Sequence, residues 1–193
     1  EAGEDLVTSI WDILSGDVKP GEDVLLYDDN GAHPGMQAAE LIADAGAALE
    51  IVSPERFFAP ELGGLNHAPY IKILQGHGAR ITINSRVHSV SRDGNKLTVS
   101  ISSDYTEGVI EHRKVDQVVV EHGTLPLDEI YFDLKEEARN RGEVDYKALI
   151  AGRPQEIATN PDGRFQLFRI GDAVASRNIH AAIYDALRLC KDF

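Results

Sequence analysis

The residues with the clearest chemical potential lie near the end of the chain, where the apolar run 165–170 meets Gly171 and Asp172. This run predicts a buried strand that stops at the glycine, with a helix following a few residues later. Such a corner places the Asp172 carboxylate, which accepts hydrogen bonds from sugar-like hydroxyls, beside a helix N-terminus that attracts phosphate oxygens. A dinucleotide such as FAD carries both hydroxyls and phosphates. The corner therefore predicts a flavoprotein site, and a plain turn followed by a helix cap is the alternative reading.

A second candidate site is the loop that follows the apolar run 24–27. Dinucleotide-binding loops carry glycines at the spacing G-x-G-x-x-G, which allows a tight turn and close approach of the backbone to pyrophosphate. If Gly35 is the third glycine, Asn30 and Ala32 occupy the first two places, and Gly31 falls between them. This altered spacing keeps open whether the loop binds NAD(H) or NADP(H).

Charge in the same loop bears on that question. Asp28 and Asp29 bring two carboxylates close to the expected position of a pyrophosphate, and His33 offsets them if it is protonated. Two carboxylates a few ångströms from a phosphate cost on the order of 1 kcal/mol or more at a surface-like dielectric constant. The alternatives are a retained fold whose nucleotide site has been lost, or aspartates that only cap the next helix.

The end of the second apolar run, 49–52, is where an acidic residue would bind an adenosine ribose. Ser53 holds that position, and Glu55 and Arg56 follow it. Glu55 remains a candidate for the ribose, and Arg56 is a candidate for the 2′-phosphate of NADP(H).

The elements that must position these residues follow an α/β pattern. Helices are expected at 5–15, 35–45, 65–75 and 134–141, with a helical turn at 145–151 and a last helix that buries Cys190 among Ile183, Leu187 and Leu189. Strands are expected at 24–27, 49–52, 80–83, 109–112 and 115–120, and an antiparallel hairpin at 86–102 turns at Asp93-Gly94-Asn95. These elements predict a Rossmann-like FAD/NAD(P)-binding fold with a parallel sheet plus a small antiparallel β-meander.

Composition and charge exclude several kinds of partner and site. The formal net charge of −13 argues against nucleic acid and anionic membranes as partners. Cys190 is the only cysteine, so the chain contains neither an internal disulfide nor a cysteine-ligated cluster. The seven histidines lack metal-ligand spacing, no spacing singles out a catalytic residue, and no apolar run has membrane-spanning length. We expect no metal site and a cytoplasmic setting.

Four segments carry a resemblance to a known family: 24–29, 115–124, 152–155 and 169–189. In these segments the chain resembles the C-terminal region of the NADH:flavin oxidoreductase family, which includes trimethylamine dehydrogenase, histamine dehydrogenase and 2,4-dienoyl-CoA reductase. Within it, the chain is most similar to members of the N-methylproline demethylase type.

The resemblance implies an order of domains. A TIM barrel with FMN and a 4Fe-4S cluster comes first, followed by half of an FAD-like domain, an inserted NAD(P)-like domain and the returning half. On that pattern 1–19 is a helix and linker from the preceding FAD-like half, 20–125 is the inserted domain, and 126–193 is the returning half. The expected partners are a dinucleotide and the TIM barrel of the same polypeptide, and a homo-oligomer is compatible with the pattern.

The resemblance also assigns roles to residues. It implies contact with FAD or ADP at Gly171 and Asp172, a helix start facing flavin or pyrophosphate at Arg177, Asn178, Ile179 and His180, and a nucleotide loop at Asn30, Gly31, Ala32, His33 and Gly35. The implied function is a nucleotide-binding fragment of a flavin-dependent amine demethylase, amine dehydrogenase or enoyl reductase, inactive alone. The alternative is a non-catalytic Rossmann-like module for packing or oligomerisation.

Overall fold

The chain forms two compact units, Glu1–Gly123 and Thr124–Phe193, and the computed structural model describes residues 3–190 of them. The ends of the predicted segments 1–19 and 126–193, residues 1–2 and 191–193, lie outside the described residues. The identity assigned to each segment stays a prediction. Each unit is described by itself below.

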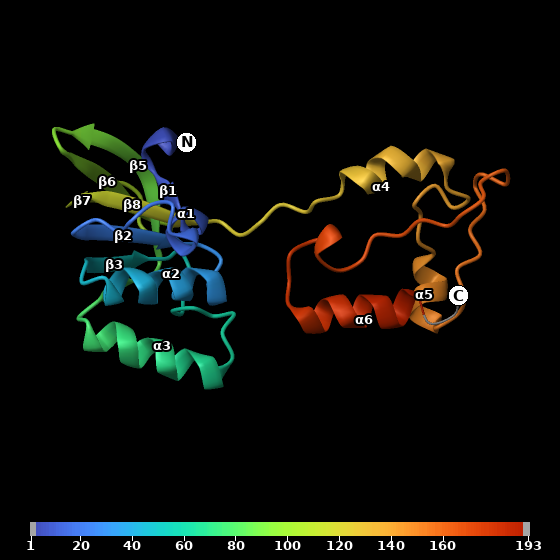
Figure 1. Ribbon diagram of the computed structural model, residues 1–193, viewed down its shortest axis with the longest axis horizontal. Coiled ribbons are helices and arrows are strands. Elements are labelled where there is room, and N and C mark those ends of the chain that lie inside the picture. The colour runs from blue at the N-terminus through green and yellow to red at the C-terminus, as the bar shows by residue number, and fades with distance from the viewer. Residues whose placement is uncertain (1–2, 191–193) are drawn as a thin grey trace. The chain divides into compact units, whose positions relative to one another are not determined.

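The first unit contains a five-stranded parallel sheet (Figure 1). Its order is β1-β8-β2-β3-β4, from β1 (Thr8–Ser9), β2 (Asp23–Asp28), β3 (Ala48–Val52), β4 (Arg80–Thr82) and β8 (Gln117–Glu121). In the register of β2 and β8, Asp28 lies opposite Glu121. The last residues of these two central strands are therefore neighbouring carboxylic acids at the carboxyl edge of the sheet.

Side-chain alternation along β2 divides the first unit into two cores. Val24 and Leu26 pack against α1 (Ile10–Ser15), α2 (His33–Asp44) and α3 (Gly64–Gly76). Leu25 and Tyr27 point the other way, into a second cluster that a smaller sheet covers. Figure 1 shows α2 and α3 on one side of the parallel sheet and the smaller sheet on the other. Because both faces of β2 are covered, the strand is apolar almost throughout.

The smaller sheet is an antiparallel meander of β5 (Ser85–Asp93), β6 (Lys96–Ser103) and β7 (Ile110–Val115). The predicted hairpin turn is confirmed, because Gly94 lies between β5 and β6 with φ of 62°. Arg113 of β7 donates from Nε to Glu50 of β3 at 2.8 Å, an ion pair that joins the meander to the parallel sheet. The predicted fold class is confirmed.

The second unit is built differently. Its elements are α4 (Glu129–Leu134), the 3-10 turn η2 (Lys135–Glu137), α5 (Tyr146–Ala151), the 3-10 turn η3 (Gly171–Ala173) and α6 (Ile179–Cys190). No strand occurs within 124–190. The helix expected at 134–141 is wrong in position, because helical structure ends at Glu137 and Arg141 takes a φ of 47°, which a helix cannot continue.

The strand expected at 165–170 is also wrong for the described structure. Its backbone bonds to a loop instead of to a neighbouring strand: Arg139 N donates to Phe165 O at 2.7 Å. The buried Asn140 accepts from Leu167 N at 2.9 Å and donates to Leu167 O at 2.8 Å. A parallel strand needs a partner edge, and the described part of this unit contains none.

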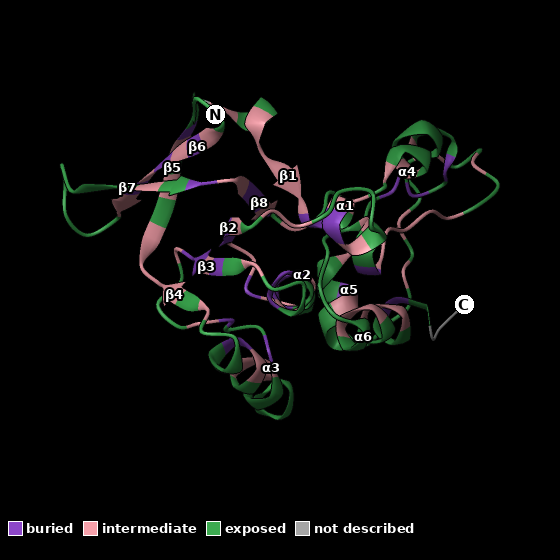
Figure 2. Ribbon diagram, turned by 60° about the vertical axis from the view of Figure 1, so that its left-hand side comes forward, coloured by how far each residue is buried: buried purple, intermediate pink, exposed green. Residues whose placement is uncertain are grey.

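Burial is sparse in the second unit. The buried apolar residues of 124–190 are Ala138, Ala148 and Leu189. Figure 2 shows α6 mainly in the colours of exposed and intermediate residues. The expectation of a buried Cys190 is wrong: the thiol is exposed, because Ile183 and Leu187, which were expected to cover it, are themselves 61% and 60% exposed.

Candidate functional site

The carboxyl edge of the parallel sheet holds two buried acids, Asp28 and Glu121, each 2% exposed. The Asp28 Oδ1 atom accepts hydrogen bonds from Asn30 N at 3.0 Å and from Gly31 N at 2.8 Å. Burial raises the pKa of Asp28 to about 6. The two backbone hydrogen bonds act against this rise, and the nearby charge of Glu121 adds to it. The side chain therefore holds the loop in place through two hydrogen bonds, although burial leaves its carboxylate poorly solvated.

The same carboxyl group lies against the first turn of α2. A Cβ atom placed on Gly35 would be 2.6 Å from Asp28 Oδ2, so only glycine leaves room for the carboxylate there. Gly31, with φ of 65°, is similarly confined, because an added Cβ would lie 2.5 Å from Cδ of Pro60. Pro34 at the start of α2 removes one N–H that a helix N-terminus would offer to an anion.

Glu121 organises the other half of the edge. Its Oε1 accepts from Asn30 Nδ2 at 3.0 Å and from Gly123 N at 2.8 Å. Asp29 bonds to His122 Nδ1 at 2.9 Å, and the His122 ring lies edge-on to Tyr27. Glu121 was not among the predicted site residues. The only signal for it was its position at the end of an apolar strand.

The remaining predicted residues of this unit have no hydrogen bond to Asp28 or Glu121 among the described contacts. Ala32 precedes α2 without a side-chain cap. His33 is exposed, and its Nε2 lies 3.4 Å from Asn66 Nδ2. Glu55 is exposed in the loop after β3, where its N–H donates to Ser53 Oγ at 3.3 Å. Their assignment to a nucleotide site stays a prediction.

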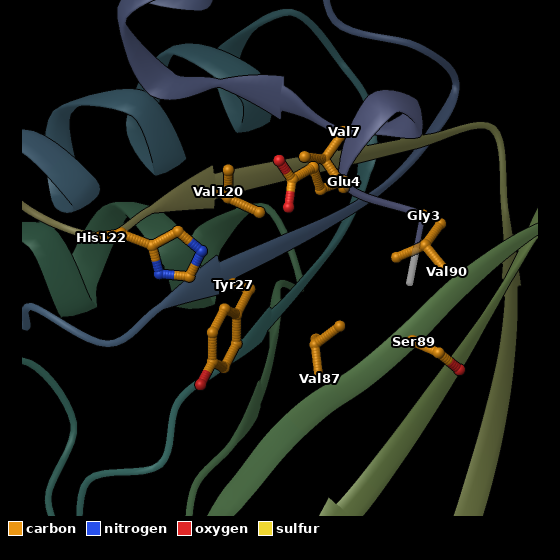
Figure 3. Close-up of a pocket in the computed structure, with 9 residues that line it drawn as sticks. All are labelled: Gly3, Glu4, Val7, Tyr27, Val87, Ser89, Val90, Val120 and His122. Atoms are coloured by element: carbon orange, nitrogen blue, oxygen red, sulfur yellow. The ribbon is translucent and has the colours of Figure 1, made fainter. Parts of the chain in front are cut away.

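A small cavity lies beside this edge, between β5 and the strands β2 and β8 (Figure 3). It measures about 60 Å³ and is lined by Val7, Tyr27, Val87, Val120 and His122, among others. Cofactor pockets are several times larger, on the order of 300 Å³ or more. The cavity has room for a few waters and no room for a nucleotide.

The predicted corner of the second unit is centred on Gly171, which is buried and has a φ of 57°. A Cβ there would approach Ala182 Cβ to 3.1 Å, so glycine allows the corner to pack on α6. Gly171 N donates to Asp185 Oδ2 at 3.1 Å, and Arg177 Nη2 donates to the same oxygen. Arg177 lowers the pKa of Asp185 by that hydrogen bond. The sequence gives no indication that Asp185 contacts this corner, because it lies fourteen positions beyond Gly171.

The other predicted residues of the corner surround the start of α6. Asn178 Oδ1 accepts from Ala181 N at 2.9 Å, which makes Asn178 the cap of the helix. Asp172 is exposed, and its Oδ1 accepts from Arg177 N at 3.4 Å. Ile179 and His180 are exposed in the first turn. The structure thus brings the six predicted corner residues together in one unit and the predicted loop residues together in the other.

The two sets can do different chemistry. In the first unit the loop donors already bond to Asp28 and Glu121, within the part of the chain that the structure describes. In the second unit, the Asp172 carboxylate and the first turn of α6 are open to a ligand that carries hydroxyl and phosphate groups. Among the described residues, no group of histidines, cysteines and acids could hold a metal ion. None of the described helices is long and apolar enough to cross a membrane.

Curated proteins from two bacteria are similar to almost the whole of this chain. No protein-family model matches it. It is 54% identical over 190 residues to a probable N-methylproline demethylase from Rhizobium meliloti, covering 98% of this chain and 28% of that protein. It is 45% identical over 192 residues to an N,N-dimethylglycine/sarcosine dehydrogenase from Chromohalobacter salexigens, covering 97% of this chain and 28% of that protein.

A solved structure shares the fold over the whole chain. It is the 6-hydroxypseudooxynicotine amine oxidase from Pseudomonas geniculata N1, with a TM-score of 0.69, 23% identity, and coverage of 100% of this chain and 26% of that one. The chain spans little more than a quarter of the length of its curated relatives. The chain therefore resembles the C-terminal region of longer enzymes of the NADH:flavin oxidoreductase family.

Proposed function

We propose that this chain is the C-terminal nucleotide-binding part of a longer flavin-dependent oxidoreductase of the amine demethylase, amine dehydrogenase or enoyl reductase type. Its second unit positions FAD or ADP. The observation that carries the proposal is an uncovered apolar helix face beside the Gly171 corner, in a unit with almost no core of its own.

The uncovered face belongs to α6. Ile179, Ile183 and Leu187 recur every four residues, which places them on one side of the helix, and they are 71%, 61% and 60% exposed. Apolar stripes of this kind are normally buried against another element. This chain covers only 28% of each of the two curated relatives, so most of their length lies outside the matched region. We propose that the preceding half of an FAD-like domain, from that additional length, covers this face.

The run 165–170 supports the same arrangement. It is apolar at Phe165, Leu167, Phe168 and Ile170, and no described strand of its unit lies beside it. A strand edge from the preceding half would give it the ladder that its sequence predicts. The second unit is thus one half of a sheet-based domain.

The residues at the corner fit a dinucleotide. Asp172 has an exposed carboxylate for ribose or ribityl hydroxyls, and the first turn of α6, where Ile179 and His180 are exposed, would offer backbone N–H groups to phosphate oxygens. Gly171 keeps the backbone close to α6, and Asp185 holds both Gly171 and Arg177 in position. A bound flavin would supply the redox chemistry, and these residues would only bind and orient it.

Other cofactors of such an enzyme must reside elsewhere. A 4Fe-4S cluster needs several cysteines, and this chain has one. We propose that FMN and any cluster are held by the additional chain found in the relatives, together with the substrate. This chain alone is therefore expected to show no turnover of NADH with an artificial electron acceptor above the background of free flavin.

The test uses the longer enzyme and one pair of variants. Asp172→Ala should reduce the amount of retained FAD or ADP, because it removes the hydroxyl acceptor at the corner. Asp133→Ala, an exposed aspartate of α4, is the matched control and should leave retention unchanged. Cofactor released by denaturation is quantified for each variant. Normal stoichiometry in Asp172→Ala would contradict the assignment. If the unchanged enzyme itself retains neither FAD nor ADP, a non-catalytic packing module becomes the better account.

A further inference from the structure

The first unit has the sheet of a pyridine-nucleotide domain, yet its loop does not fit the ligand. We infer that the first unit binds neither NADH nor NADPH, because the Asp28 carboxylate occupies, as an internal anion, the position of the dinucleotide's pyrophosphate. The inference concerns the loop from Asp28 to Gly35 and is independent of the corner in the second unit.

The hydrogen-bond donors of the loop are the first reason. A dinucleotide-binding loop offers its backbone N–H groups to pyrophosphate oxygens. Here the N–H groups of Asn30 and Gly31 both donate to Asp28 Oδ1, and Gly123 N donates to Glu121 Oε1. Pro34, the second residue of α2, has no N–H to offer. Three N–H groups that could otherwise recognise a phosphate are thus engaged by the protein's own carboxylates.

The space at the helix start is the second reason. In a dinucleotide fingerprint, the glycines leave room for the pyrophosphate and for close packing of helix and strand. The room that Gly35 provides is filled by Asp28, whose Oδ2 lies 2.6 Å from the position of an added Cβ. The room beside Gly31 is filled by Pro60. These glycines are explained by contacts inside the protein.

Charge is the third reason. Asp28 and Glu121 are opposite each other in the register of β2 and β8, and Asp29 follows directly. Within the described residues, neither Asp28 nor Glu121 forms an ion pair with a lysine or arginine, and Asp29 pairs only with His122. A pyrophosphate at this edge would add negative charge to three carboxylates, of which two are screened poorly because they are buried.

The experiment is a titration of the isotope-labelled chain with NADH, NADPH and ADP, followed by amide chemical shifts. In the unchanged chain, the amides of 28–36 should not move at 5 mM NADH or NADPH. Asp28→Gly removes the internal anion and empties its space, so those amides should shift with millimolar NADH. Asp28→Asn, which keeps the shape and removes the charge, should show a smaller response and serves if Asp28→Gly does not fold. Asp29→Asn is the matched control and should stay silent.

Two results would overturn the inference. One is binding of NADH or NADPH to the unchanged chain below about 0.1 mM with shifts confined to 28–36. The other is a folded Asp28→Gly and a folded Asp28→Asn that are both as silent as the unchanged chain, which would remove Asp28 as the cause. Shifts of 171–181 with ADP report on the proposed corner instead, so the two proposals fail separately.

Discussion

The two units of this chain differ in how completely they bury their own apolar surface. The first has two core clusters, one on each face of the parallel sheet, with side chains such as Leu26 and Val118 fully buried. The second buries Ala138, Ala148 and Leu189 within its described residues, and leaves Ile150 and Ile179 more than 70% exposed. The first unit therefore buries a core of its own, whereas the second leaves most of its large apolar side chains exposed, as we propose for one half of a domain.

The same contrast separates the two candidate sites. In the first unit, Asp28 and Glu121 accept hydrogen bonds from Asn30, Gly31 and Gly123, so these donors are engaged within the protein. In the second unit, Asp172 and the start of α6 remain exposed. A retained fold is therefore weak evidence for a retained ligand, and the polar groups at the carboxyl edge are the better guide.

The largest expected effect is on stability in the first unit. Leu26→Ala should lower its free energy of unfolding by about 2–5 kcal/mol, because it opens a cavity in a fully packed core. Leu187→Ala, at the exposed face of α6, should cost less than about 0.5 kcal/mol in this chain. Chemical denaturation followed by circular dichroism measures both. Equal losses would break the contrast between the units.

A pH dependence is expected next, from Asp28. Its pKa in the folded chain is about 6, above the ordinary value of 3.8, so the folded state holds this proton more tightly than the unfolded state. Its contribution to stability is therefore full below about pH 4 and is lost as the pH rises through about 6. Asp28→Asn should abolish this loss and stabilise the chain at pH 8 by about 1–3 kcal/mol.

The control for this prediction is Asp29→Asn, which alters a partly exposed side chain paired with His122. It should leave the fall in stability between pH 4 and 6 in place. Denaturation midpoints of the three proteins, measured across that range, give the comparison. If Asp28→Asn destabilises the chain at pH 8, the carboxylate is a net stabiliser and our account of the loop is wrong.

The smallest effect is expected at the corner. Gly171→Ala strains a φ of 57° and brings a methyl group to 3.1 Å from Ala182, whereas Gly152→Ala strains a φ of 63° in open space. Strain alone costs about 1 kcal/mol at either position. Faster amide exchange of α6 in Gly171→Ala than in Gly152→Ala would isolate the contact with Ala182, and equal exchange would show that it contributes nothing.

The sequence predicts most of the first unit, because its signals are local. The helix expected at 5–15 is wrong in its first half, because the helix begins only at Ile10, after the short strand β1 (Thr8–Ser9). Apolar runs bounded by turn residues locate β2, β3 and β8, and Asp93-Gly94-Asn95 locates the hairpin. It predicts the second unit poorly, because strand structure at 165–170 depends on a partner edge that these residues do not contain. The predicted burial of Cys190 is wrong for the same reason, because residues on an apolar helix face are buried only where another element covers that face.

The site was predictable only in outline. The altered glycine spacing and the pair Asp28-Asp29 already cast doubt on pyridine-nucleotide binding. That Asp28 turns inward onto Gly35, with Glu121 opposite, depends on the register between two strands almost a hundred residues apart. Asp185 likewise becomes part of the corner only once α6 packs on Gly171.

The proposal that the second unit is one half of a domain is tested most directly by hydrogen–deuterium exchange of α6 in this chain and in the longer enzyme purified with its flavin. Our account predicts that amides of 179–190 exchange rapidly in this chain and at least a hundredfold more slowly in the longer enzyme. The amides of β2 should exchange slowly in both. Equal exchange of α6 in the two proteins would mean that nothing covers its apolar face, and would contradict the account.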